Sequence, residues 1–315
     1  MRGGSSRGAA GGEAHGLAVL AVTVAVATWG FSNVVIKAIS TTGLVASFYR
    51  LWFAVPLLWL ISTAVPPIRR GLTREWLKAC LLGGGLFGVH QILFFNSLKL
   101  TSVANVTIIG ALQPALVLVV AGRLFNEKVV ARSVIWSLVA VCGTIVVVIG
   151  SAGTPNWSPL GDALAVANLF AFTTYFLASK QIRSHIGAPE YVTGMTTVAG
   201  FVILAACLVT DQKLSAPTGR DWPLLLFLAV FPGTLGHFLT NWAHQHTSAF
   251  VMSIMLLAVP VIACAGAAVF LGEHLGTPQI AGGLIVLLAI GVIIRSVRMT
   301  TREELAESVA QTDAP

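Results

Sequence analysis

The sequence predicts an all-α integral membrane protein with ten transmembrane helices, arranged as two inverted five-helix repeats. Three observations lead to this prediction. Of the 315 residues, 56% are hydrophobic and only 10% are charged. The charged residues fall in short gaps between long apolar stretches, and several residues recur at one fixed offset along the chain. Because soluble domains carry about 25% charged residues, the composition excludes an ordinary soluble enzyme and a disordered chain.

The gaps between charges define the expected helices. Charged side chains are costly in hydrocarbon, and a helix needs about 20 residues to cross a bilayer core of about 30 Å. The uncharged intervals are residues 16–36, 51–68, 79–98, 100–122, 133–161, 163–179, 191–210, 222–272 and 275–294. The interval 222–272 is too long for one crossing and contains the polar stretch 241–248, where we expect a turn. Dividing it there gives ten helices.

The two ends of the chain are expected to lie outside the helical part. The first apolar run is longer than the core of a signal peptide and lacks a small-residue cleavage motif, so we expect the first helix to be retained. Residues 1–15 and 299–315 are expected to be flexible cytoplasmic tails. Between them, the two repeats are expected to cover residues 17–150 and 160–296.

The distribution of basic residues predicts the orientation. With the amino terminus in the cytoplasm, the inside segments carry fourteen Lys and Arg residues, whereas the outside connections carry only Lys99, Lys213 and Arg220. This asymmetry predicts a multi-pass protein of the cell membrane with both termini cytoplasmic. The net charge of +7 is thereby explained by topology, so we expect the lipid bilayer and no nucleic acid as a partner.

The cysteines give no sign of a metal or disulfide framework. Cys80, Cys142, Cys207 and Cys264 all lie inside apolar runs, without CxxC or Cys/His ligand spacing. They are interpreted as small packing residues. We therefore expect no metal site and no cofactor.

An internal repeat links the two halves. Thr101-Ser102, Pro114 and Glu127 recur 146 residues later as Thr247-Ser248, Pro260 and Glu273. Proline and glutamate are scarce in this chain, so their equal spacing is informative. Since five helices are an odd number, the second copy is reversed across the membrane, and Glu127 and Glu273 are expected on opposite sides.

The chain resembles the EamA branch of the drug/metabolite transporter superfamily over residues 17–296. The resemblance rests on residues 29–33 with Lys37, residues 48–50, Pro114 with residues 124–127, Gly161-Asp162, and Pro260 with residues 270–273. The family's Leu-Gly-Glu is intact at residues 271–273 but is Phe-Asn-Glu at residues 125–127. The resemblance implies a ten-helix carrier of small metabolites, amino acids or drugs.

Polar side chains inside the spans indicate a central cavity. A buried Asn, Gln or His is costly in lipid and should face an interior. Such residues, or a Ser/Met stripe, occur in helices 1, 3, 4, 6, 8 and 9, so helices 2, 5, 7 and 10 are expected at the periphery. The alternative is that single polar residues merely bridge helices by hydrogen bonds. The expected substrate site comprises Trp29, Asn33, His90, Phe94, Asn105, Tyr175, His237, Asn241 and Met252.

Four charged residues are expected at mouths or gates: Lys37, Arg50, Glu127 and Glu273. Lys37 and Arg50 should lie toward the outer leaflet, where they either reach water past the lipid or attract anions to the outer mouth. The two glutamates are interpreted as helix-terminus or gate residues. No Asp or Glu lies in the middle of a span.

These patterns predict a secondary transporter that exports a small amphipathic metabolite, such as an amino acid, by alternating access. The alternatives are a membrane-embedded enzyme or a channel with the same helix count. The chain lacks the Gly-x-Ser-x-Gly and His-Glu-x-x-His patterns of intramembrane proteases. It also lacks charged rings or a filter-like sequence. We therefore expect a carrier with a small-molecule substrate, and no enzymatic activity.

Overall fold

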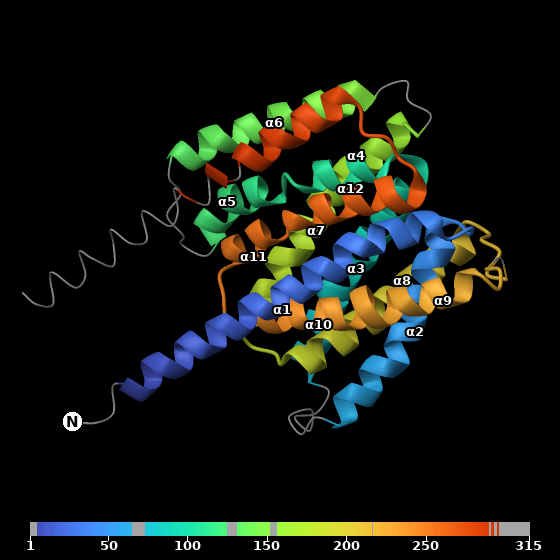
Figure 1. Ribbon diagram of the computed structural model, residues 1–315. Coiled ribbons are helices and arrows are strands. Elements are labelled where there is room, and N and C mark those ends of the chain that lie inside the picture. The colour runs from blue at the N-terminus through green and yellow to red at the C-terminus, as the bar shows by residue number, and fades with distance from the viewer. Residues whose placement is uncertain are drawn as a thin grey trace, which may run out of the picture.

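The computed structural model describes residues 5–64, 73–124, 131–151, 156–215, 217–289, 291–292 and 295, and these form an all-helical bundle (Figure 1). Within this part of the chain, seven helices are long and apolar enough to cross a membrane. Three shorter apolar helices, Val103–Val117, Val134–Val147 and Thr277–Ala289, bring the spans to ten. The predicted fold class and helix count are confirmed.

Six of the spans are single helices that carry labels in Figure 1, and three are assembled from shorter pieces. The single ones are α1 (Ser5–Ala38), α2 (Gly43–Ala64), α3 (Arg74–Leu100), α6 (Ala131–Ser151), α7 (Pro159–Ile182) and α8 (Ala188–Val209). The assembled ones are α4 (Val103–Gly110) with α5 (Gln113–Leu124), α9 (Asp221–Leu228) with η2 (Ala229–Gly236) and α10 (His237–Ala243), and α11 (Ala249–Met255) with α12 (Ala258–Leu271). The tenth span is the helix Thr277–Ala289.

The structure describes most of the first expected tail and none of the second. Helix α1 begins at Ser5, so residues 5–15 are helical where the sequence predicts a flexible tail. The second tail, 299–315, lies outside the described residues, as does Glu127.

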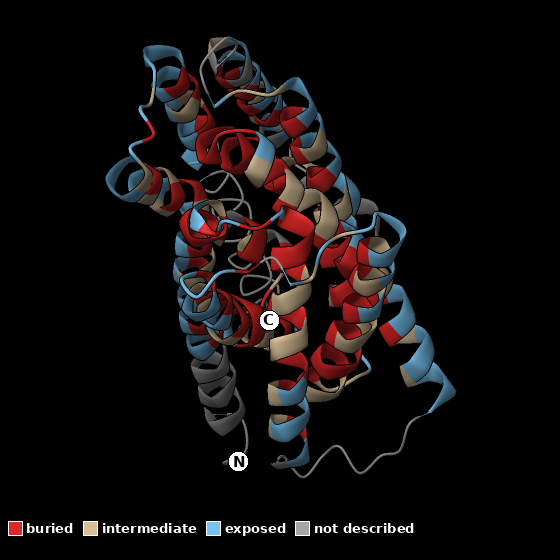
Figure 2. Cartoon of the chain, turned by 90° about the vertical axis from the view of Figure 1, so that its right-hand side faces the viewer, coloured by how far each residue is buried: buried red, intermediate tan, exposed pale blue. Residues whose placement is uncertain are grey.

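Glycines set the closest helix contacts. A Cβ added to Gly84 of α3 would lie 2.5 Å from Val198 Cβ of α8, and one added to Gly88 would lie 2.8 Å from Val202 Cγ1. On the opposite flank, where Figure 1 shows the helix Thr277–Ala289 beside α6, a Cβ on Gly282 would lie 2.5 Å from the Gly143 carbonyl oxygen. Small residues thus allow close backbone approach. Figure 2 shows buried residues on the inner faces and exposed ones on the outside.

The fourth and ninth spans are interrupted at corresponding places. The breaks fall at residues 111–112 and 256–257, just before Pro114 and Pro260. A proline has no N–H to donate to the carbonyl four residues earlier, which is that of Gly110 or Leu256. The Ser102 and Ser248 hydroxyls each accept a hydrogen bond of 3.1 Å from the N–H three residues later, so both spans also begin alike. These equivalent features recur at or near the 146-residue offset, so the repeat is visible in the structure as well as in the sequence.

The eighth span is irregular in its centre. Its middle third, η2, is a π-helix that contains Pro232. Such segments free backbone carbonyls and often occur at functional sites. The Pro232 carbonyl accepts hydrogen bonds from Trp29 Nε1 at 3.0 Å and from Arg50 Nη2 at 3.4 Å. The irregular segment is thereby joined to α1 and α2.

Candidate functional site

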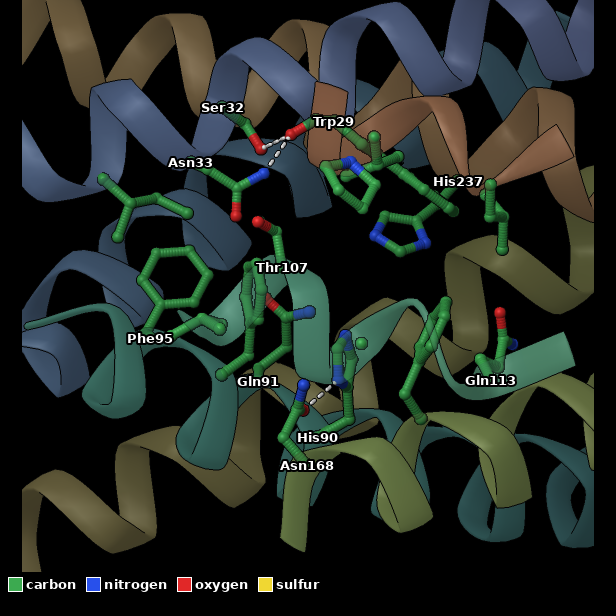
Figure 3. A pocket seen from close by; sticks show the side chains of 18 of the residues that line it. Trp29, Ser32, Asn33, His90, Gln91, Phe95, Thr107, Gln113, Asn168 and His237 are labelled. Carbon is green, nitrogen blue, oxygen red and sulfur yellow. Dashed lines mark hydrogen bonds between the residues drawn. The ribbon is translucent and has the colours of Figure 1, made fainter. Parts of the chain in front are cut away.

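A cavity of about 120 Å³ lies between the helices of the two halves. Because one water needs roughly 10–15 Å³ measured in this way, the space holds several waters or a small solute. Its wall consists of Trp29, Ser32, Asn33 and Ile36 of α1, Arg50 of α2, His90, Gln91, Phe94 and Phe95 of α3, Val106, Thr107, Gly110 and Gln113 of α4 and α5, Asn168 and Phe172 of α7, His237 of α10, and Leu256, Val259 and Pro260 of the ninth span. Figure 3 shows many of these side chains converging on one space.

The lining spans are those that the sequence indicates, with one addition. They are the first, third, fourth, sixth, eighth and ninth spans, together with the second through Arg50. Both interrupted spans contribute residues beside their breaks, Gly110 and Gln113 in one and Leu256 and Pro260 in the other. Paired interruptions at corresponding positions of two repeats are typical of transporter binding sites.

Five of the nine expected site residues line the cavity: Trp29, Asn33, His90, Phe94 and His237. The other four lie behind it or away from it. Asn241 donates a hydrogen bond to the Tyr175 hydroxyl at 3.3 Å and another to the His237 carbonyl at 2.9 Å. The Tyr175 ring lies parallel to that of His90, with the ring centres 6.2 Å apart. Tyr175 and Asn241 therefore support the two cavity histidines from behind.

Asn105 and Met252 have other surroundings. The Asn105 side chain donates to both carboxylate oxygens of Asp162, at 3.0 and 3.1 Å. Met252 is fully buried in an apolar cluster formed with α1, α5 and α7. Both side chains lie outside the cavity wall, so here the structure corrects the expectation that they face the cavity.

Arg50 also differs from expectation. The sequence places it toward the outer leaflet, either reaching water past the lipid or drawing anions to a mouth, whereas the structure places it in the cavity wall, 4% exposed. Small residues one turn away on the same face, Ala46 and Ala54, are fully buried and let α2 pack closely there. This face of α2 is directed into the protein rather than into lipid.

Hydrogen bonds fix the tautomer of one cavity histidine. His90 Nδ1 lies 2.6 Å from the Asn168 side-chain oxygen, as Figure 3 shows. Because an amide oxygen only accepts, Nδ1 carries the proton, and in the neutral ring Nε2 is an acceptor. The ring is held between α3 and α7 in one orientation.

Aromatic rings form much of the remaining wall. The Trp29 and His237 ring centres are 4.8 Å apart, and those of His90 and Phe172 are also 4.8 Å apart. Phe87, which lies behind the wall, packs edge-on against His237 at 4.6 Å. Such a surface accepts a flat or apolar group while its imidazoles and amides remain available for polar ones.

Three buried polar atoms of lining residues have no hydrogen-bond partner within the described part of the chain: Asn33 Oδ1, Gln113 Nε2 and His237 Nδ1. Buried polar groups are normally paired, so unpaired ones in a cavity wall mark positions for water or solute. The Asn33 amide nitrogen already donates to the Trp29 carbonyl at 2.7 Å, which leaves the oxygen free. In Figure 3 this oxygen points away from its own helix.

At one end of the bundle, here called the Lys37 end, carboxylates join the two halves of the chain. It contains the end of α1 and the starts of α4, α7 and α9. Lys37 Nζ donates to the Thr101 carbonyl at 2.5 Å. Three carboxylates at this end belong to the second half of the chain and accept hydrogen bonds from the first. They are Asp162, which accepts from Thr101 and Asn105, Asp221, which accepts from Ser40, and Glu273, which accepts from the Val103 N–H.

Glu273 is nearly buried in this cluster. Burial raises the pKa of its carboxyl above the usual range, and the nearby Lys37 charge and the Val103 N–H oppose that rise. The structure thus brings Lys37 and Glu273 to one end of the bundle, while Arg50 lies in the cavity wall.

The opposite end, here called the Lys180 end, contains the end of α7 and the turn after α10. Lys180 Nζ donates to the carbonyls of His244 and Thr247, at 2.5 and 2.6 Å. Thr247 is the repeat equivalent of Thr101, so at each end the carbonyl of the equivalent threonine accepts a hydrogen bond from a lysine. Arg183 Nε donates to the Asn241 carbonyl at 2.8 Å, so these contacts all lie within the second half.

The cavity contains polar residues that the expected site omits. Gln91, Gln113 and Asn168 carry the same signal as Asn33, an amide inside an apolar span. Ser32 and Thr107 give no such signal, because a hydroxyl in a helix can be satisfied by the backbone of its own helix. Here the two hydroxyls donate to the carbonyls of Trp29 and Val103.

A ten-helix bundle of two repeats around a central cavity, with paired helix breaks, defines a membrane transporter of the inverted-repeat class. A solved crystal structure has the same fold, with a TM-score of 0.67 at 17% sequence identity, covering 88% of this chain and 96% of the other. The model of the EamA-like transporter family matches residues 16–149 and again residues 159–295. The chain belongs to this family, and the resemblance seen in its sequence is confirmed.

Curated relatives are also transporters by name. The chain is 26% identical to the "Uncharacterized transporter YyaM" of Bacillus subtilis, covering 89% of this chain and 94% of that protein. It is 25% identical to the "Probable amino-acid metabolite efflux pump" of Salmonella typhimurium, over 91% of this chain and 97% of the other. It is 24% identical to the "Aromatic amino acid exporter YddG" of Ancylobacter novellus, over 57% of this chain and 62% of that protein.

Proposed function

We propose that this protein is a secondary carrier that exports a small amphipathic metabolite, of the amino-acid type, across the cell membrane by alternating access. The observation that carries the proposal is the cavity between the halves, where amide, imidazole and aromatic side chains meet beside two equivalent helix breaks. The names of two relatives, an amino-acid metabolite efflux pump and an aromatic amino acid exporter, support the solute class. Trp29, Asn33, His90, Phe94 and His237 form the proposed substrate site.

The proposed orientation places both termini and the Lys180 end in the cytoplasm. Basic residues concentrate at that end, where Arg74 and Lys78 begin α3 and Lys180 and Arg183 end α7. Positive charge marks the cytoplasmic side of short loops. The Lys37 end then faces outward.

Gating is proposed to occur by breaking one end at a time. At the Lys37 end, three carboxylates hold the two halves together, and hydrogen bonds to charged groups contribute about 1.5–3 kcal/mol each. Among the described residues, which do not include Glu127, neutral groups join the halves at the Lys180 end: the Ser62 hydroxyl with that of Thr193 at 2.5 Å, and Trp76 Nε1 with the Glu190 carbonyl at 3.1 Å. This difference supports the proposal that the described conformation is the outward-closed one.

Transport by the purified protein in proteoliposomes tests the proposal. Vesicles preloaded with one unlabelled amino acid are given its labelled form outside, and exchange is compared with that of empty vesicles. A panel of apolar, aromatic, acidic and basic amino acids is used. We expect exchange of apolar or aromatic members and its loss in Asn33→Ala and His237→Ala. Absence of exchange for the whole panel contradicts the proposed solute class.

A further inference from the structure

The cavity wall contains one permanent charge within the described residues, the guanidinium of Arg50. Arginine keeps its proton at any physiological pH and offers five N–H donors. The side chain is 4% exposed, so its charge is removed from bulk water. Placing a charge there is costly unless other groups compensate for the lost hydration.

The groups that surround this guanidinium are all neutral. Nη1 donates to Gln91 Oε1, and Nη2 donates to the Pro232 carbonyl at 3.4 Å, a long hydrogen bond. The Phe95 ring lies with its centre 5.6 Å from the guanidinium carbon. Among the described residues, the cavity wall contains no Asp or Glu. The positive charge therefore faces the cavity without an anionic partner from the wall.

The chain backbone makes room for this arrangement. A Cβ added to Gly233 would lie 2.7 Å from the Leu228 carbonyl oxygen and 3.5 Å from Arg50 Nε. The π-helix around Pro232 thus brings bare backbone against the arginine side chain. The guanidinium is held in place by a carbonyl, an amide and a ring, which position it and leave its charge uncompensated.

We propose that Arg50 binds the carboxylate of the transported solute, so that the substrates are monocarboxylates, specifically amino acids with an apolar or aromatic side chain. This inference rests on the proposed function and adds to it the group that selects the substrate. A guanidinium pairs with a carboxylate through two parallel hydrogen bonds. A single cation matches a single negative charge, which favours a carboxylate over a doubly charged phosphate.

The rest of the wall fits the other parts of such a solute. Asn33 Oδ1 is a buried acceptor without a partner in the described chain, and it suits an ammonium group. Trp29, Phe94 and Phe172 provide the aromatic surface for an apolar side chain. A zwitterion with these three parts supplies an anion for Arg50 and a hydrogen-bond donor for Asn33 Oδ1.

The rival interpretation is that Arg50 only holds α2 against α3 and η2. Two comparisons separate the interpretations. In exchange assays with labelled L-phenylalanine, the competitor 3-phenylpropionate keeps the carboxylate and lacks the ammonium, whereas phenethylamine keeps the ammonium and lacks the carboxylate. We expect the acid to inhibit the unaltered protein at least tenfold more strongly than the amine, a result that needs no variant.

The second comparison uses variants that alter charge and preserve contact. Gln91→Glu keeps an acceptor beside Arg50 and adds an internal carboxylate, so it should strengthen a purely structural link while occupying the guanidinium. We expect this variant to fold normally, to raise the KM for L-phenylalanine at least tenfold and to lose the preference for acid over amine. Arg50→Gln should do the same, and Arg50→Lys should retain the preference with a higher KM.

The outcomes are distinct. Equal inhibition by the acid and the amine in the unaltered protein overturns the assignment of Arg50 and leaves the carrier function intact. Retention of the acid preference in Gln91→Glu or Arg50→Gln overturns it as well. If the unaltered protein exchanges none of the amino acids of the panel, the proposed solute class fails and the assignment fails with it.

Discussion

Thr101 and Thr247 occupy equivalent positions in the two repeats and lie at opposite ends of the bundle. Each carbonyl accepts a hydrogen bond from a lysine, Lys37 at one end and Lys180 at the other. The hydroxyls differ. Thr101 Oγ1 donates to Asp162 at 2.8 Å, whereas Thr247 Oγ1 is buried and has no partner among the described residues. The two ends share a framework, but only one is reinforced by a carboxylate at this position.

Among the described residues, the two ends of this inverted repeat are therefore joined by unequal sets of hydrogen bonds. The lysine contacts and the serine caps are common to both halves, as the repeat requires. The carboxylates Asp162, Asp221 and Glu273 link the second half to the first at the Lys37 end. A carrier that works by alternating access needs one end to be closed while the other opens. Stronger hydrogen bonding at the Lys37 end would favour the state in which that end is closed in the absence of solute.

The largest effect is expected from Asp162→Ala. The change removes an acceptor shared by Thr101, Asn105 and Trp157, and each buried donor left unpaired costs about 1–3 kcal/mol. We expect the purified protein to melt at a clearly lower temperature and the Lys37 end to open. Asp162→Asn, which keeps the shape, should open this end with a smaller loss of stability. Unchanged melting in both variants contradicts the role of this carboxylate.

A smaller effect is expected from Asp221→Asn. This carboxylate accepts from the Ser40 N–H at 2.9 Å and its hydroxyl at 2.5 Å, and also from Thr218. Because the amide retains one acceptor oxygen, we expect a loss of about 1–2 kcal/mol, measured as a shift in thermal unfolding. A loss larger than that of Asp162→Ala would reverse the order of importance at this end.

The matched pair Thr101→Val and Thr247→Val sharpens the comparison. Valine has nearly the shape of threonine and no hydroxyl. Thr101→Val breaks a bond to a charged group, so we expect a loss of about 1.5–3 kcal/mol. Thr247→Val removes a buried hydroxyl that has no partner in the described part of the chain, and it should be neutral or slightly stabilising. Equal losses in the two variants would contradict the inequality of the ends.

Only a small loss is expected from Ser62→Ala at the Lys180 end. Its hydroxyl pairs with that of Thr193, and a neutral hydrogen bond contributes about 0.5–1.5 kcal/mol. We expect slightly lower stability and faster exchange when opening of this end limits the rate. Slower exchange with unchanged substrate affinity would argue that this contact does not restrain the gate.

The sequence predicts the framework well because it depends on hydropathy and spacing. Ten spans, the repeat and six of the seven spans that line the cavity follow from uncharged intervals, from the offset of Pro114 and Pro260, and from scarce polar residues. The interruption of two spans also follows from these prolines, since each removes a backbone donor in the middle of a helix.

The particular residues of the site are harder to predict, because one helix position does not tell what a polar side chain contacts. Asn105 resembles Asn33 in sequence, yet it pairs with Asp162, a residue 57 positions away. Arg50 resembles a cation reaching water past the lipid, yet it lies in the cavity wall. The buried Ala46 and Ala54 on its face are the signal that favours packing over lipid exposure.

Access to the cavity from either side of the membrane shows whether the Lys37 end is the closed outward gate. Gly110 lines the cavity, and a Cβ added there meets no atom within 4 Å, so Gly110→Cys is a suitable reporter once Cys80, Cys142, Cys207 and Cys264 are replaced. The measurement is its labelling by a membrane-impermeant thiol reagent applied to either side of oriented vesicles. The account predicts labelling from the cytoplasmic side only, with labelling from outside appearing when Asp162→Asn is added. Labelling from the outside in the unaltered background, with protection from the cytoplasmic side, would contradict it.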